Sequence, residues 1–114
     1  MGDRAANDER RRHPRVASGF SVVELTGQTT YFQYATNLSE GGLFLERTLP
    51  HPPGTRVALL FKVPHQREPI AVEAEVLGGS SEGQGMRLRF VDLDQHPELL
   101  ERVRGLVEKV RTAA

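Results

Sequence analysis

Apolar and polar residues alternate along much of the chain, in the period-two pattern typical of β-strands with one buried face. Residues 56–63 give the clearest example, with apolar side chains at every second position, namely Val57, Leu59, Phe61 and Val63. The alternation recurs in residues 70–77 and 86–90, where the predicted inward side chains are Ile70, Val72, Ala74, Val76, Met86, Leu88 and Phe90. Glu73 and Glu75 are then predicted to face solvent. These three segments are predicted strands.

Three more strands are predicted before them. Residues 20–25 and 30–36 are rich in β-branched and aromatic side chains, which favour a pleated, half-buried surface. A turn at Thr26–Thr29 separates these two segments, and a short apolar run at 43–45 forms the third strand. The proline-rich segment 50–54 is a stiff connection that joins no ladder.

The pattern changes near the end of the chain. Over residues 97–111 apolar side chains recur at helical spacing, at Leu99, Val103, Leu106, Val107 and Val110. Pro97 suits the first turn of such a helix. About six strands at short spacing, followed by one amphipathic helix, indicate a mainly β fold: an antiparallel β-barrel of about six strands with one C-terminal α-helix.

Size and charge narrow the range of functions. The 114 residues are enough for one domain with a sizeable core. The formal net charge is zero, which argues against a general attraction to a nucleic acid polymer or an anionic membrane. The sequence has no cysteine, so disulfides, thiol catalysis and thiolate metal sites are excluded. No apolar run reaches the roughly 18–20 residues of a membrane span or forms a signal-peptide core, so we expect a cytoplasmic protein.

The charge is distributed unevenly along the chain. Residues 1–15 contain five arginines against three acidic residues. An arginine run near a terminus is by itself most often a solvated tail. We expect a mobile tail at 1–9 and a single domain at 10–114, made of an arginine arm at 10–15, a barrel over about 16–93 and a helix over about 97–111.

The turn after the second predicted strand contains candidate binding residues. Asn37 and Ser39 are short polar side chains that hydrogen-bond either a ligand or their own backbone. Gly41 and Gly42 let the main chain come close to whatever lies above it. By itself, such a turn is usually a plain hairpin connection. Covered by an arginine arm it would suit a planar anionic ligand, because guanidinium groups stack on bases and bind phosphates.

Together, Arg11-x-x-x-Arg15 and Asn37-x-Ser39-x-x-Gly42 resemble the paired signature of PilZ domains, which are bacterial receptors for cyclic di-GMP. The resemblance runs from about Glu9 to about Leu93. It implies a β-barrel with a helix packed on it, and cyclic di-GMP as the ligand without any cofactor. It also implies ligand-binding roles for Arg11, Arg15, Asn37, Ser39 and Gly42.

Two further arginines bear on this site. Arg10 stands just before the arginine pair, at a family position that influences whether one ligand or a stacked pair is bound. We hypothesise that a stacked dimer of cyclic di-GMP binds per site, with Arg10 as an additional stacking surface. Arg87 departs from the family pattern, because Gly85-Met86-Arg87 has arginine where a second glycine is common. It would either crowd the site or add a phosphate contact.

These residues predict a non-enzymatic receptor whose arm becomes ordered on cyclic di-GMP and so alters the surface shown to an unidentified protein partner. The alternative is an adaptor with the same fold that has lost nucleotide binding. The zero net charge disfavours a small nucleic-acid-binding barrel. No residues form a catalytic constellation. The four histidines, His13, His51, His65 and His96, match no metal spacing and are predicted to lie at the surface.

Overall fold

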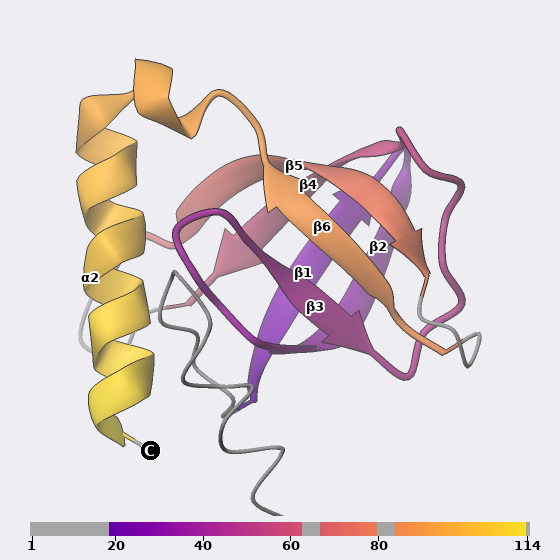
Figure 1. The fold of residues 1–114 in the computed structure, drawn as a ribbon, viewed down its shortest axis with the longest axis horizontal. Helices are drawn as coiled ribbons and strands as arrows, with labels where there is room; N and C mark the ends of the chain where they lie inside the picture. Colours follow the sequence, from indigo (N-terminus) through magenta and orange to yellow (C-terminus); the bar gives the residue numbers. More distant parts are fainter. Residues whose placement is uncertain (1–18, 63–66, 80–83, 114) are drawn as a thin grey trace, which may run out of the picture.

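Six antiparallel strands close into a barrel with one long helix beside it in the computed structural model, which describes residues 19–62, 67–79 and 84–113 (Figure 1). The strands are β1 (Phe20–Thr26), β2 (Thr29–Thr36), β3 (Gly42–Glu46), β4 (Arg56–Phe61), β5 (Ile70–Gly79) and β6 (Met86–Phe90). A 3-10 helix, η1 (Leu93–Gln95), precedes the helix α2 (Pro97–Ala113). This confirms the predicted fold class. The predicted tail at 1–9 and arginine arm at 10–15 lie outside the described residues.

The order of strands around the barrel is β1-β2-β3-β6-β5-β4, and β4 pairs with β1 to close the ring. β1 and β2 form a hairpin across the predicted turn, with Thr26 paired to Thr29. β3 pairs with β6 rather than with β4, the next strand in sequence. This crossover brings the turn before β3 next to the last strand and to the helix that follows it.

The barrel interior is built from the alternating apolar residues. Val57, Leu59 and Phe61 of β4 are buried, as predicted. The predicted inward residues of β5 and β6 are also buried, namely Ile70, Val72, Ala74, Val76, Met86, Leu88 and Phe90. β4 ends at Phe61, two residues before its predicted end, and Val63 lies outside the described residues.

β5 contains an irregularity that alters what its outer face presents to β6. The pairing of these two strands shifts register between Val76 and Gly78, as in a β-bulge. Val76 pairs with Leu88, and Gly78 pairs with Arg87, so Leu77 has no partner across the ladder. Its side chain is 44% exposed on the outside of the barrel.

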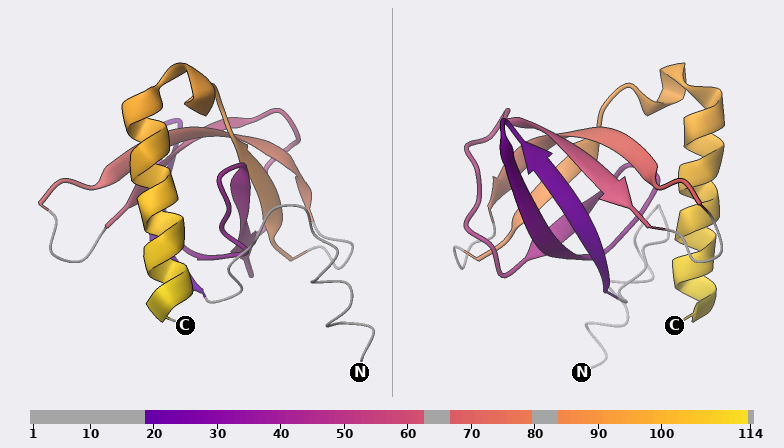
Figure 2. Two further views of the ribbon diagram at one scale, coloured as in Figure 1. Left: turned by 60° about the vertical axis from the view of Figure 1, so that its left-hand side comes forward. Right: turned by 180° about the vertical axis from the view of Figure 1, so that it is seen from behind.

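The helix α2 stands beside the barrel, next to the loop between β2 and β3 (Figures 1 and 2). Val103 and Leu106 are buried against the barrel core. Partly buried side chains pack around them, namely Leu99, Leu100, Val107 and Val110. The predicted apolar stripe is therefore core packing, and the helix extends two residues beyond its predicted end.

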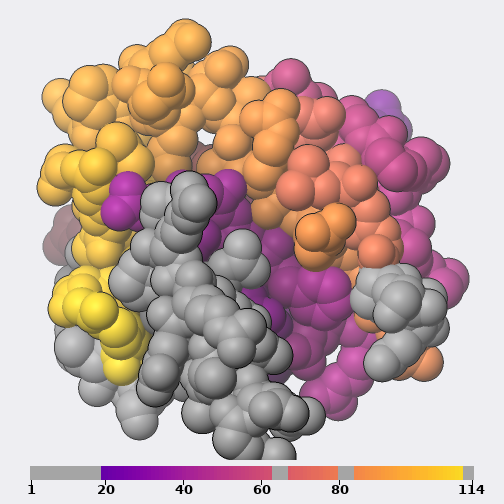
Figure 3. Space-filling model, in the orientation of Figure 1, coloured from indigo at the N-terminus to yellow at the C-terminus, as the bar shows by residue number. Residues whose placement is uncertain are grey.

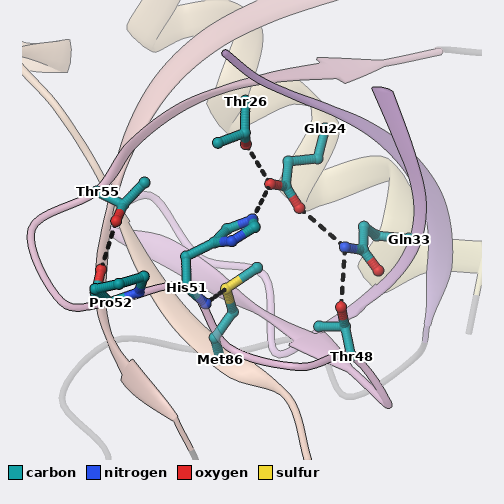
Figure 4. Close-up of polar contacts among 8 residues, drawn as sticks. All are labelled: Glu24, Thr26, Gln33, Thr48, His51, Pro52, Thr55 and Met86. Atoms are coloured by element: carbon teal, nitrogen blue, oxygen red, sulfur yellow. Dashed lines mark hydrogen bonds and ion pairs between the residues drawn. The ribbon is translucent and has the colours of Figure 1, made fainter. Parts of the chain in front are cut away.

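The barrel end away from α2 contains a buried carboxylate (Figure 4). Glu24 is completely buried, and its two oxygens accept hydrogen bonds from the Thr26 hydroxyl and from Gln33 Nε2 at 2.9 Å. His51 Nε2 lies 2.6 Å from the same carboxylate. The prediction that His51 is a surface residue is therefore wrong, because its ring is largely covered and holds a buried acid.

Candidate functional site

The loop between β2 and β3 is fixed by its own hydrogen bonds. Asn37 has φ 54, a left-handed conformation that asparagine tolerates better than most residues. The Ser39 amide donates to the Gly42 carbonyl at 2.9 Å, and the Gly41 amide donates to Ser39 Oγ at 3.2 Å. Leu38, which lies between Asn37 and Ser39 in the sequence, is fully buried and anchors the loop in the core. The polar side chains are thereby held in one place.

The two glycines attach this loop to β6. The Phe90 amide donates to the Gly41 carbonyl at 2.8 Å. Gly42 is buried, and a Cβ atom there would lie 2.0 Å from the Leu88 carbonyl oxygen and 2.9 Å from Arg89 Cα. Only glycine fits so close to a neighbouring main chain. Glycine is therefore required at position 42 by the close approach of the neighbouring strand β6.

A groove of about 890 Å³ runs between this loop, the outer faces of β3 and β6, and α2. Its polar rim is the loop, with Asn37, Ser39, Gly41 and Gly42. Its apolar wall consists of Phe44, Leu77, Leu93, Leu100 and Val107. In Figure 3, α2 (yellow) and β6 (orange) stand on either side of the loop (purple). The volume suits a small-molecule ligand.

Four arginines line the groove, and three of them have acidic partners. Arg89 pairs with Glu75 at 2.5 Å, and Arg111 with Glu108 at 2.5 Å. Arg104 bridges two carboxylates, Glu40 at 3.0 Å and Glu101 at 2.8 Å.

These partners affect the arginines' ionisation. The hydrogen bond that Arg104 donates to Glu40, followed by the one that it donates to Glu101, raises the pKa of Arg104 above its ordinary value. The hydrogen bond that Arg111 donates to Glu108 likewise raises the pKa of Arg111. Both groups therefore stay charged. Among the described residues, no carboxylate pairs with Arg87, the fourth arginine of the groove.

The family model described as the PilZ domain matches residues 9–108. The chain belongs to the PilZ domain family. PilZ domains are cyclic di-GMP receptors that use no cofactor. The match covers the barrel and most of α2, and so extends beyond the end at about Leu93 that the motif resemblance indicated. No curated protein sequence matches the chain significantly.

Two solved structures resemble this PilZ domain in fold. One is the PilZ domain of YcgR from Escherichia coli with c-di-GMP, at a TM-score of 0.70 and 15% identity, covering 91% of this chain and 93% of that one. The other is the inhibitor of motility MotI/DgrA from Bacillus subtilis, at a TM-score of 0.58 and 22% identity. That alignment covers 85% of this chain but only 52% of the Bacillus protein. At these identities the likeness shows the fold alone.

The structure brings together four of the seven predicted site residues. Asn37, Ser39, Gly41 and Gly42 all line the groove. The other three, Arg10, Arg11 and Arg15, lie outside the described residues.

Sequence reasoning missed the contribution of α2 to the groove. Leu100, Arg104, Val107 and Arg111 line it. Their spacing of four, three and four residues places them on one face of a helix. This spacing could have revealed the groove-lining face of the helix from the sequence. The apolar stripe Leu99-Val103-Leu106-Val110 is the more evident pattern, and it indicates only the face that packs on the barrel.

Neither metal binding nor membrane insertion has support in the described part of the chain. No group of three or more His, Cys, Asp or Glu side chains within residues 19–62, 67–79 and 84–113 is arranged to hold a metal ion. Within the same ranges, neither helix combines the length and apolar character that a membrane crossing requires.

Proposed function

We propose that this PilZ domain is a non-enzymatic receptor that binds cyclic di-GMP at the Asn37–Gly42 loop, in the bacterial cytoplasm. The observation that carries the proposal is the rigid polar loop at the rim of an open groove with apolar and cationic walls. A cyclic dinucleotide presents flat bases and two phosphates, so its receptor needs apolar surface, fixed polar groups and positive charge. The groove and the arginine arm supply these together.

Each motif residue has a chemical role in this proposal. Ser39 Oγ already accepts the Gly41 amide, so its hydroxyl proton is left to donate to a phosphate or a guanine acceptor. The Asn37 amide offers both a donor and acceptors to a base edge. Arg11 and Arg15 form charge-assisted hydrogen bonds to phosphate oxygens or to guanine O6 and N7. Arg10 stacks on a base of a second nucleotide, so that a stacked dimer is bound.

In this proposal, ligand binding changes the surface that the domain presents to a protein partner. Binding orders the arginine arm against the loop and the nucleotide, and this alters what a protein partner meets. The ion pair between Glu40 and Arg104 also links the loop directly to α2. The solved structure of a protein named as an inhibitor of motility shares this fold, which fits an adaptor that acts through a protein partner.

Titration calorimetry of the purified protein with cyclic di-GMP, and with GTP as control, tests the proposal. We expect micromolar or tighter binding of cyclic di-GMP only. Saturation at two nucleotides per protein is expected if Arg10 supports a stacked dimer, and saturation at one would refute that part. Absence of heat, together with an unchanged melting temperature, would refute the receptor role and leave the non-binding adaptor.

Substitutions in the Asn37–Gly42 loop test whether the ligand binds in the groove. Asn37→Gly removes the amide while keeping a residue that accepts positive φ, so it separates the side chain's role from backbone strain. Ser39→Ala removes the hydroxyl. Ser21→Ala, on an exposed position of β1 that does not line the groove, is the matched control. We expect both loop variants, and not the control, to weaken binding.

A further inference from the structure

Two neighbouring arginines on the outer face of β6 differ in their surroundings. Arg87 and Arg89 are both exposed, while Met86, Leu88 and Phe90 between and beside them face the core. Arg89 stands opposite Glu75 of β5 on one side and opposite Gly42 of β3 on the other. Its guanidinium is drawn to Glu75, 2.5 Å away. Its positive charge is therefore compensated within the sheet.

Arg87 has no such compensation from the residues that the structure describes. It stands opposite Gly78 of β5 on one side and Phe44 of β3 on the other. Neither neighbour carries an acid, and no hydrogen bond or ion pair joins Arg87 to another described residue. The register shift at Val76/Gly78 leaves Leu77 unpaired and places a glycine against Arg87.

Arg87 also lies on the groove that the Asn37–Gly42 loop borders. Its cross-strand neighbour Phe44 is two residues from Gly42 along β3, a rise of roughly 6.6 Å, on the same outer face. The Phe44 ring packs over Gly85, where a Cβ atom would lie 2.4 Å from the tip of the ring. The groove thus has, side by side and close to the polar loop, a firmly placed aromatic ring and a cation that pairs with no carboxylate in the described part of the chain.

We propose that Arg87 is a further ligand contact, which binds a phosphate of the cyclic dinucleotide held at the Asn37–Gly42 loop. This inference rests on the proposed function. A guanidinium forms two parallel hydrogen bonds with a phosphate, and it binds more strongly where no internal carboxylate competes. The Phe44 ring beside it offers apolar surface to the ribose or base attached to that phosphate. Arginine at this position therefore adds a contact and does not crowd the site.

The test compares Arg87→Ala with the matched control Arg56→Ala in calorimetric titrations with cyclic di-GMP. Both variants remove one exposed arginine from a strand of the barrel, but Arg56 of β4 pairs with Glu73 and does not line the groove. We expect Arg87→Ala to weaken binding about ten- to a hundredfold, as the loss of a hydrogen bond to a charged group does. Arg56→Ala should stay within about threefold of the parent protein, because Arg56 lies outside the groove. Arg87→Lys keeps the positive charge but loses the planar guanidinium with its two parallel donors, so its affinity should lie between those of the parent and Arg87→Ala.

The outcomes separate this inference from the proposed function. Binding by the parent and equal or tighter binding by Arg87→Ala would overturn the role of Arg87 and leave the receptor intact. Equal losses in Arg87→Ala and Arg56→Ala would also overturn it, because general electrostatics would then be the cause. No binding by the parent would refute the receptor and the Arg87 contact together. Melting temperatures of the variants show that they are folded, and Arg87→Gln replaces Arg87→Ala if that variant is not.

Discussion

The Glu40 carboxylate in the β2–β3 loop lies 3.0 Å from Arg104 Nε on α2, and so joins the candidate ligand loop to the C-terminal helix across 64 residues of sequence. Arg104 also holds Glu101 of its own helix at 2.8 Å. All three side chains are about half exposed or more. An exposed ion pair such as this contributes little to stability, because solvent screens the two charges. Such a contact is easily broken and remade, which suits a link between ligand and helix better than a structural support.

Removing this link should uncouple α2 from the ligand. In the parent protein, we expect cyclic di-GMP to change hydrogen exchange in α2 as well as in the loop. In Arg104→Ala the loop should still respond while the change in α2 shrinks. Arg111→Ala is the control, because Arg111 pairs with Glu108 of the same helix and, among the described residues, with no carboxylate of the loop. An equal response of α2 in the parent and in Arg104→Ala would show that the helix responds by another route.

Gly42→Ala should destabilise the fold, since the added methyl group would collide with the Leu88 carbonyl at the β3–β6 junction. Overpacking of this kind costs about 1–3 kcal/mol, and the upper end applies here because a main chain must move. Urea unfolding measures the loss as a lower midpoint at unchanged slope. Gly41→Ala is the control, with its nearest neighbour at 3.8 Å, and should stay within about 0.5 kcal/mol of the parent. Normal stability of Gly42→Ala with lost binding would instead assign the glycine to the ligand.

Much of the fold follows from short-range pattern. The alternation in Val57, Leu59 and Phe61 predicts a strand and its buried face, because side-chain direction in a strand has a period of two. The same reasoning fails at Glu24, a charged residue at an inward position. Its partners Gln33 and His51 come from two other segments, so only the folded chain makes its burial acceptable.

In the candidate site, too, some features follow from local sequence and others depend on the folded chain. Asn37 and Ser39 are recognisable as turn residues because a turn's chemistry is local, and their pairing with Arg11 and Arg15 in one motif marks them as candidate ligand contacts. The groove is not recognisable in this way, because it forms only when β3 pairs with β6 and α2 docks beside them. The pairing of Arg87 with Gly78 depends on the bulge in β5, a shift of one residue that the alternation pattern of residues 70–77 does not reveal.

The Glu24 cluster should be a major source of stability. Glu24→Ala would leave the His51 ring and the Gln33 amide without their shared acceptor inside the barrel end. Leaving a buried hydrogen-bond donor without its acceptor typically costs about 1–3 kcal/mol, and Glu24→Ala does this to two donors. Glu73→Ala is the matched control, since Glu73 also sits in a strand but pairs with Arg56 in solvent, and it should cost less than about 1 kcal/mol. Denaturant unfolding of both variants checks this, and equal small losses would contradict it.

Arg11→Ala and Arg15→Ala should each weaken cyclic di-GMP binding roughly ten- to a hundredfold, because each removes a hydrogen bond between charged groups that contributes about 1.5–3 kcal/mol. Ser39→Ala should cost less, since a hydroxyl bond carries no full charge. Arg12→Ala is the decisive control, because it removes the same charge from the same arm at a position outside the motif. If Arg12→Ala weakens binding as much as the other two, the arm attracts the ligand only by its net charge. If Arg15→Ala binds as tightly as the parent, the arm is a solvated tail, and the Asn37–Gly42 loop and the groove must hold the nucleotide without it.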